Sequence, residues 1–139
     1  MTMVFASVGS VAFRNCSVID DSNENWSKDL LENGKLSCAY FVSAMMKIFD
    51  LIADLHVTVD GTIGDMKISG WHEIVIRDQK DIFNILQSGD VIVWKGDPHK
   101  HIGFYFGAGA AISNCSGTGT IIAHRYDYQK IEKIFRFNF

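Results

Sequence analysis

Cys38 and His101 are the two residues of this 139-residue chain whose types and placement could do chemistry together. A cysteine attacks as the thiolate, and the start of a long helix favours that form through its unpaired backbone N–H groups and its dipole. An imidazole within hydrogen-bond reach must take the proton and later return it to the leaving group. The pair therefore predicts nucleophilic catalysis, with Cys38 as the nucleophile and His101 as its general base.

A third polar side chain usually orients such an imidazole by accepting a hydrogen bond from its second ring nitrogen. His101 opens an apolar segment, and the glycines at 107 and 109 turn the chain back into residues 110–115. On this return segment Ser113 and Asn114 are the polar candidates. Gly103, two residues after His101, would leave room beside the ring for a neighbouring backbone or a substrate.

The nucleophile is expected to lie at the start of a central helix. Residues 38–55 contain no glycine or proline, and apolar residues recur among them at three- and four-residue steps. A turn is predicted at 32–35, and Ser37 is of a type suited to the N-cap. Because the apolar stripe extends almost all round, this helix is predicted to be covered on most of its faces.

Strands are expected to follow the helices and to carry the base. A second, shorter helix is predicted to end at Ser69, before Gly70. The order of helices first and antiparallel strands afterwards is typical of an α+β fold. With 47% apolar residues, the chain is expected to form a single domain over residues 1–139. Apolar patterns predict strands at 91–94, 101–106, 110–115, 120–126 and 133–139, and a looser alternation predicts one at 4–13.

Charge and hydropathy argue against several classes of function. The net charge is −3 and the basic residues are scattered, so we expect no nucleic-acid partner. No apolar run is long enough to cross a bilayer, and no signal peptide is recognisable, so the cytoplasm is the expected location by default. The three cysteines have no close-ligand spacing, which favours a reducing compartment. The sequence leaves the oligomeric state undetermined.

Three segments, in this order, resemble the NlpC/P60 and CHAP group of cysteine peptidases and amidases. They are Ser37–Ser43, Ser88–Trp94 and His101–Gly107. In that group a cysteine opens a helix, a Gly-Asp-hydrophobic strand follows, and a His-hydrophobic-Gly-hydrophobic-Tyr strand supplies the base. The resemblance covers roughly residues 36–124. It implies a papain-like fold, with the cysteine-bearing helix packed on an antiparallel β-sheet, and hydrolysis of an amide or peptide bond, with bacterial cell-wall peptidoglycan as the substrate.

The chain also departs from that group. Ser37-Cys38-Ala39-Tyr40 stands where the group commonly has Asp-Cys-Ser-Gly, so the chain resembles a divergent branch. Counted without gaps, the group's third polar residue falls on Ser113, but serine is a poor imidazole orienter, and a bulge would bring Asn114 to the same face. We therefore predict Asn114 as the orienting residue, with Tyr40 and Ser113 in the substrate site. Because peptidoglycan lies outside the membrane, a phage-borne or otherwise exported enzyme would fit the lack of a signal.

Other interpretations stay open at this point. A free cysteine is more often a small buried hydrophobe, and a strand-end histidine is often simply exposed. His99 and His101 form an H-x-H pair to which Cys115 or His124 could add a metal ligand, but no further ligand spacing supports this, so no metal or cofactor is expected. A non-catalytic binding module of the same fold, or an intracellular cysteine amidase or transferase, would carry the same residues.

Overall fold

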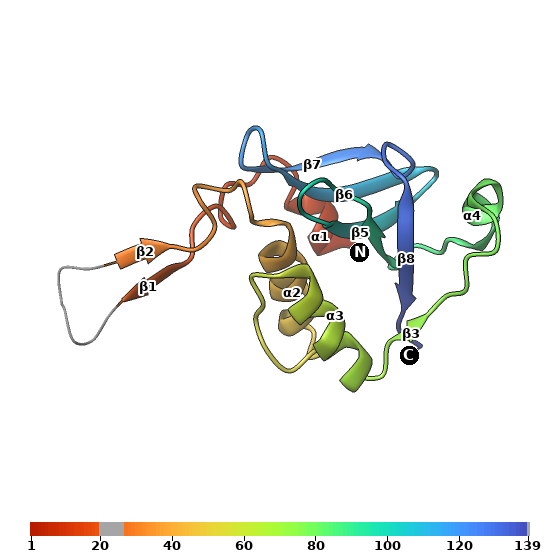
Figure 1. Cartoon of the computed structure of the whole chain (residues 1–139), viewed down its shortest axis with the longest axis horizontal. Helices are drawn as coiled ribbons and strands as arrows, with labels where there is room; N and C mark the ends of the chain where they lie inside the picture. The colour runs from red at the N-terminus through yellow and green to blue at the C-terminus, as the bar shows by residue number, and fades with distance from the viewer. Residues whose placement is uncertain (20–26, 139) are drawn as a thin grey trace.

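The fold is built on one six-stranded antiparallel sheet. The computed structural model describes residues 1–19 and 27–138. The strand order is β3-β8-β4-β5-β6-β7, and Figure 1 shows that the sheet twists strongly from β8 to β7. The predicted α+β class with an antiparallel sheet is therefore confirmed. The strands are β3 (His72–Glu73), β4 (Val91–Trp94), β5 (His101–Gly107), β6 (Ala110–Cys115), β7 (Thr120–Arg125) and β8 (Ile131–Arg136).

Few helices accompany this sheet. Figure 1 shows α2 and α3 side by side below β5 and β6, with a small β1-β2 hairpin projecting away from them. Among the described helices, none has both the length and the apolar character that crossing a bilayer requires. The elements are α1 (Thr2–Ala6), α2 (Cys38–Ile48), α3 (Val59–Ile68), the 3-10 turn η1 (Gln79–Asp81), α4 (Ile82–Ile85), β1 (Ser17–Ile19) and β2 (Ser27–Asp29).

Helix α2 begins at Cys38, as predicted, but it ends at Ile48 rather than near Leu55. Asp50 adopts a positive φ of 56°, which stops the helix, and the Leu51 N–H turns back to the Met46 carbonyl. Ser37 occupies the N-cap position, but its side chain makes no capping hydrogen bond. Its backbone is already in the helical region, so the hydroxyl does not reach the free N–H groups of the first turn.

The N-terminal strand predicted at 4–13 is wrong. Residues 2–6 form helix α1 instead, with Val4 buried and Phe5 stacked on Phe106 of β5. The segment that follows meets the outer edge of β7, where the Gly9 N–H donates to the Ile121 carbonyl and the Ile121 N–H donates to the Ser10 carbonyl. The weak alternation in this segment thus reflects one buried helical side chain and a short edge contact.

The two faces of the sheet carry separate apolar clusters, and this alternation fixes where each polar side chain points. The helix face, which contacts α2 and α3, includes Val91, Val93, Ile102, Phe104, Ile112 and Ile121. The opposite face, covered in part by α4 and the chain before it, includes Ile92, Trp94, Tyr105, Ala111, Ile131 and Ile134. Successive residues of a strand point to opposite faces. A shift of one residue therefore moves a side chain from one cluster to the other.

Asp90 belongs to the Gly-Asp segment that resembles the NlpC/P60 and CHAP group, and it forms a structural ion pair with Arg136. It is 1% exposed and accepts hydrogen bonds from Arg136 at 2.7 Å through both Nε and Nη2. It also accepts from the backbone N–H of Gln87 at 2.8 Å. This buried, bidentate ion pair ties the start of β4 to the end of β8, far from Cys38.

Gly103 lets β5 approach β6 closely next to His101. A Cβ at this position would lie 2.7 Å from the Ile112 carbonyl oxygen, 2.7 Å from the Ser113 Cβ and 3.1 Å from the Trp94 ring. The expectation that Gly103 leaves room for a neighbouring backbone is confirmed. The close approach sets the position of β6 relative to the His101 ring.

We expect Gly103→Ala to destabilise the protein by about 1–3 kcal/mol, because the new methyl group meets a backbone oxygen that cannot move alone. Gly64→Ala in α3 is the matched control, since a Cβ added there would have no atom within 4 Å. That control should leave stability unchanged or raise it by up to about 1 kcal/mol, because alanine favours helices. Thermal and denaturant unfolding measure both variants, and equal midpoints would contradict the steric role of Gly103.

Candidate active site

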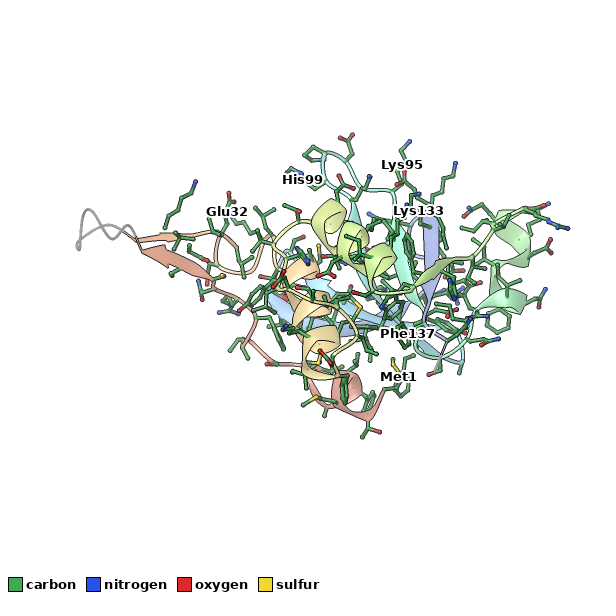
Figure 2. All side chains as sticks on the ribbon, turned by 90° about the horizontal axis from the view of Figure 1, so that it is seen from below. Met1, Glu32, Lys95, His99, Lys133 and Phe137 are labelled. Carbon is green, nitrogen blue, oxygen red and sulfur yellow. The ribbon has the colours of Figure 1, made fainter. Side chains whose placement is uncertain are left out.

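Cys38 and His101 line the same cleft, which has a volume of about 820 Å³. The cleft lies where the first residue of α2 meets the first residue of β5. Its walls come from the start of α3, from the 96–100 loop and from the ends of β6 and β7; His99, on that loop, projects beside α3 (Figure 2). Within the described residues no hydrogen bond joins Cys38 directly to His101.

The Cys38 sulfur sits where β5 and β6 stop pairing. Their ladder runs from Gly107 with Ala110 as far as Phe104 with Ile112. The backbone N–H of Ile102, two residues further on, favours the thiolate of Cys38 instead. The Ile102 N–H therefore faces the first residue of α2, and Ile102 directly follows His101 in β5.

Burial, rather than the helix start, governs the acidity of Cys38. Desolvation raises the pKa of its thiol, and it outweighs the backbone N–H groups of Ile102, Ala39 and Cys38 itself, which favour the anion. The expectation that the helix start lowers this pKa is therefore not met. In the resting protein near neutral pH, Cys38 carries its proton.

His101 is held by its Nε2 atom, which lies 2.8 Å from the Ser113 hydroxyl oxygen. The ring packs against Trp94, with centroids 5.6 Å apart. Burial, and then the charge of His124, lowers the pKa of His101 to about 4. The imidazole is therefore neutral near pH 7, and Nδ1 is the ring nitrogen left without a hydrogen bond among the described residues.

Asn114 is not the residue that contacts His101, so our prediction of this orienting hydrogen bond is wrong. Its Nδ2 atom donates to the Gly34 carbonyl at 2.7 Å, on the helix face. The bulge that would bring Asn114 to the imidazole is absent, because β6 pairs regularly with β7 through Ser113 and Asn114; the register shift between β5 and β6 falls instead in β5, between Tyr105 and Gly107. Because side chains alternate along a strand, Ser113 and not Asn114 faces the imidazole of His101. Ser113 is the residue that the gapless comparison with the NlpC/P60 and CHAP group indicated.

His124 is a member of this site that the sequence suggested only as a possible metal ligand. Its Nε2 atom lies 2.7 Å from the Ser113 oxygen, and its Nδ1 atom lies 2.8 Å from the Arg125 carbonyl oxygen. The ring also forms an edge contact with Tyr128, at 4.5 Å between centroids. Strand alternation could have indicated His124, because β7 pairs with β6 and residues 122 and 124 lie on the same face of the sheet as Ser113.

Tyr40, predicted to contact substrate, lies half-buried on α2 and does not line the cleft. Tyr128 does line it, beside both histidines. Burial, with added repulsion from the thiolates of Cys38 and Cys115, raises the pKa of Tyr128. Tyr128 therefore keeps its hydroxyl proton and can donate a hydrogen bond to a substrate in the cleft.

The imidazoles of His101 and His124 are hydrogen-bonded within the protein. In residues 1–19 and 27–138, no group of three His, Cys, Asp or Glu side chains is placed to hold an ion. Two of the histidines that the sequence offered as ligands, His101 and His124, are instead bonded to the same hydroxyl.

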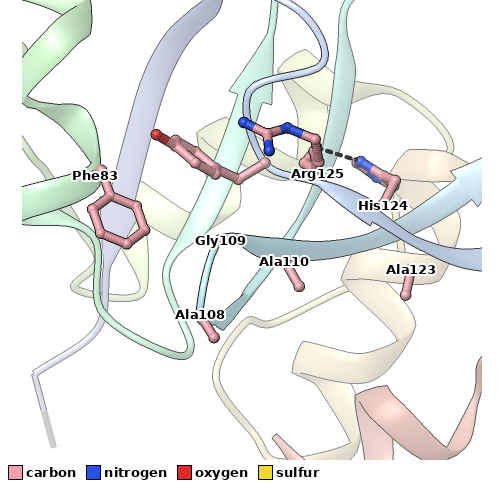
Figure 3. Close-up of a pocket in the computed structure, with 8 residues that line it drawn as sticks. Phe83, Ala108, Gly109, Ala110, Ala123, His124 and Arg125 are labelled. Atoms are coloured by element: carbon pink, nitrogen blue, oxygen red, sulfur yellow. Dashed lines mark hydrogen bonds between the residues drawn. The ribbon is translucent and has the colours of Figure 1, made fainter.

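A second cavity, of about 570 Å³, lies at the end of β7 between Phe83 and the backbone of residues 108–110 (Figure 3). His124 lines both this cavity and the cleft that holds Cys38. Figure 3 shows the hydrogen bond between His124 and Arg125 at this junction. His124 therefore forms part of the wall between the two spaces.

No protein-family model matches the chain, and no curated protein is similar to it in sequence. The function of the chain is therefore inferred from the geometry and chemistry of the site itself.

We expect Cys115, and not Cys38, to be the first of these two cysteines to react with iodoacetamide as the pH is raised. Hydrogen bonds from the Thr118 side chain and from the backbone of residues 117 and 118 lower the pKa of Cys115, while burial raises that of Cys38. Mass spectrometry after brief exposure across a pH series reports the order. Thr118→Val should move the Cys115 profile to higher pH and leave Cys38 unchanged; earlier labelling of Cys38 would refute the assignment.

The two histidines also predict how stability depends on pH. Both have a lowered pKa in the folded protein, mainly through burial, so the unfolded chain binds more protons as the pH falls below about 6.5. The free energy of unfolding should have its full value above that pH and should decrease as the pH falls toward about 4. His101→Gln should flatten this decrease in chemical denaturation measured at each pH. If the free energy of unfolding of this variant decreases with falling pH as steeply as in the wild type, groups other than His101 cause the decrease.

Proposed function

We propose that the protein is a cysteine hydrolase that cleaves an amide bond through a thioester intermediate. The observation that carries this proposal is the position of Cys38 and His101. They open α2 and β5 in one cleft, and Ser113 occupies one nitrogen of the imidazole while the other nitrogen stays available. A thiol and a base that share a cleft, with the base oriented by a third group, are what covalent acyl transfer needs.

The proposed reaction starts from a neutral pair. As the Cys38 sulfur attacks the carbonyl carbon, its proton passes to Nδ1 of His101, and the carbonyl oxygen becomes an oxyanion. The backbone N–H groups of Cys38 and Ala39, which act on the sulfur at the start of α2, are candidates to stabilise that charge. When the C–N bond breaks, His101 returns the proton to the departing amine. A thioester remains on Cys38.

Water completes the cycle. His101 removes a proton from a water molecule that attacks the thioester, and returns it to the sulfur as the C–S bond breaks. The products are the free carboxylic acid and the original thiol. The lowered pKa of His101 leaves the ring unprotonated at neutral pH, so a lone pair is available to accept the proton, but it also makes the ring a weaker base than a free imidazole.

The resemblance of the three segments to the NlpC/P60 and CHAP group supports a papain-like fold and a peptide of bacterial peptidoglycan as the substrate. The rim of the cleft carries charges of both signs: Lys35, Asp97, and the ion pair of Lys100 with Asp60 at 2.9 Å. A peptide that carries both an amino and a carboxylate group would meet charges of opposite sign at this rim.

A non-catalytic binding module of the same fold is the second candidate. The raised pKa of Cys38 is the observation that favours it, because a protonated thiol is a weak nucleophile. The proposed hydrolase requires His101 to remove the proton only when substrate is bound. Turnover therefore separates the two candidates.

The test is digestion of muropeptides from purified peptidoglycan, followed by chromatography and mass spectrometry. The wild-type protein should release new amine and carboxylate termini, and Cys38→Ala and His101→Gln should each reduce the rate by at least about 10³-fold. Cys16→Ala is the matched control and should keep full activity. Thermal unfolding should stay within a few degrees for all variants.

Two further outcomes are informative. A product formed equally by wild type and Cys38→Ala would exclude the cysteine mechanism. Binding of muropeptides without any cleavage by the wild type would favour the binding module.

A further inference from the structure

Three hydrogen bonds in series run from the candidate base into the next two strands. The His101 Nε2 atom lies 2.8 Å from the Ser113 oxygen, and that oxygen lies 2.7 Å from His124 Nε2. The series ends at the Arg125 carbonyl, 2.8 Å from His124 Nδ1, as the dashed line in Figure 3 shows. The Arg125 carbonyl determines which group donates in each of the three hydrogen bonds, because a carbonyl oxygen can only accept.

The position of each proton follows from that carbonyl. His124 must carry its proton on Nδ1 in order to donate to Arg125, so in the neutral ring Nε2 is an acceptor. The Ser113 hydroxyl must then donate to His124. Its oxygen lone pairs remain to accept from His101, which must therefore carry its own proton on Nε2. The lone pair of His101 is left on Nδ1.

We propose that His124 is a positioning residue which, through the Ser113 hydroxyl, holds His101 in the tautomer whose Nδ1 is free to take a proton. The use of this tautomer as a base for Cys38 rests on the proposed function. The order of protons in the resting protein does not.

The surroundings of the series favour a fixed arrangement. Ser113 is 1% exposed, so water does not compete for its hydroxyl. Trp94 packs on both imidazoles, with centroids 5.6 Å from His101 and 5.5 Å from His124. Tyr128 lies edge-on to both rings. These contacts restrict rotation of the two rings out of the series.

A serine suits this place because it both accepts and donates. When His101 takes a proton, the charged ring donates a stronger hydrogen bond to Ser113, whose own proton already points to His124. The charge that develops on His101 is then spread along the series. Without His124, the Ser113 hydroxyl would have no acceptor for its own proton. The contact with His124 therefore explains how a serine, which by itself orients an imidazole poorly, can hold His101.

Nitrogen-15 NMR of the resting protein at pH 7.5 tests the proton positions without any substrate. Long-range couplings between ring protons and ring nitrogens report each tautomer, and single His→Gln variants assign the signals. His124 should be in the Nδ1–H form, which is the minor tautomer of free histidine, and His101 in the Nε2–H form. His124 in the Nε2–H form would overturn the proposal.

Variants at position 124 test the function of the series. His124→Phe keeps a ring against Trp94 and Tyr128 but removes the acceptor for Ser113, whereas the side-chain oxygen of Gln in His124→Gln can still accept. His124→Phe should lower kcat for muropeptide cleavage about tenfold with KM within twofold, and His124→Gln should recover most of the loss. In His124→Phe the His101 signals should also shift toward a mixture of tautomers.

His72→Gln is the control, because His72 is exposed on β3, lines neither the cleft nor the series, and should change neither kcat nor the His101 signals. Full activity together with an unchanged His101 tautomer in His124→Phe would overturn the positioning role. If the wild type cleaves no muropeptide, the proposed function fails while the tautomers still decide the proton order. The two failures are therefore distinguishable.

Discussion

The close approach of β5 to β6 at Gly103 is the constraint on which the rest of the site depends. With no side chain there, the Ile112 carbonyl and the Ser113 Cβ come within 2.7 Å of the position a Cβ would take. This approach brings the Ser113 hydroxyl on β6 within hydrogen-bond reach of the His101 ring at the start of β5. The paired residues of the two strands end at Phe104 and Ile112, and the Ile102 N–H faces Cys38 at the start of α2. The absence of a side chain at Gly103 therefore allows the hydrogen bond that positions the candidate base.

Burial gives the site a neutral resting state. Desolvation raises the pKa of Cys38 and lowers that of His101, so both effects oppose a thiolate–imidazolium pair. Helix starts favour anions by a modest amount, and here the enclosed position of the sulfur has the larger effect. A neutral pair also protects the thiol from side reactions until a substrate carbonyl supplies a place for the negative charge.

The sequence predicts those parts of the fold whose signal is local. Strands β4 to β7 have strong apolar patterns, and each lies within about one residue of its predicted range. The start of α2 is also predicted, whereas its end depends on the conformation of Asp50, for which the apolar pattern carries no signal. The preference for Asn114 over Ser113 fails because the bulge lies in β5 and not in β6. The place of His124 requires the register of β6 with β7, which is a tertiary property.

The adjacent residues Ser113 and Asn114 show how one strand can position both partners of the site. Because their side chains point to opposite faces, Ser113 bonds to the candidate base, and Asn114 donates to the Gly34 carbonyl in the turn that leads into α2. That turn is held tightly, since Gly34 approaches Gly119 so closely that a Cβ on it would lie 2.5 Å from the Gly119 Cα. The polar dipeptide that is ambiguous in sequence thus has two distinct contacts. The first fixes the imidazole, and the second fixes the turn that presents Cys38 to it.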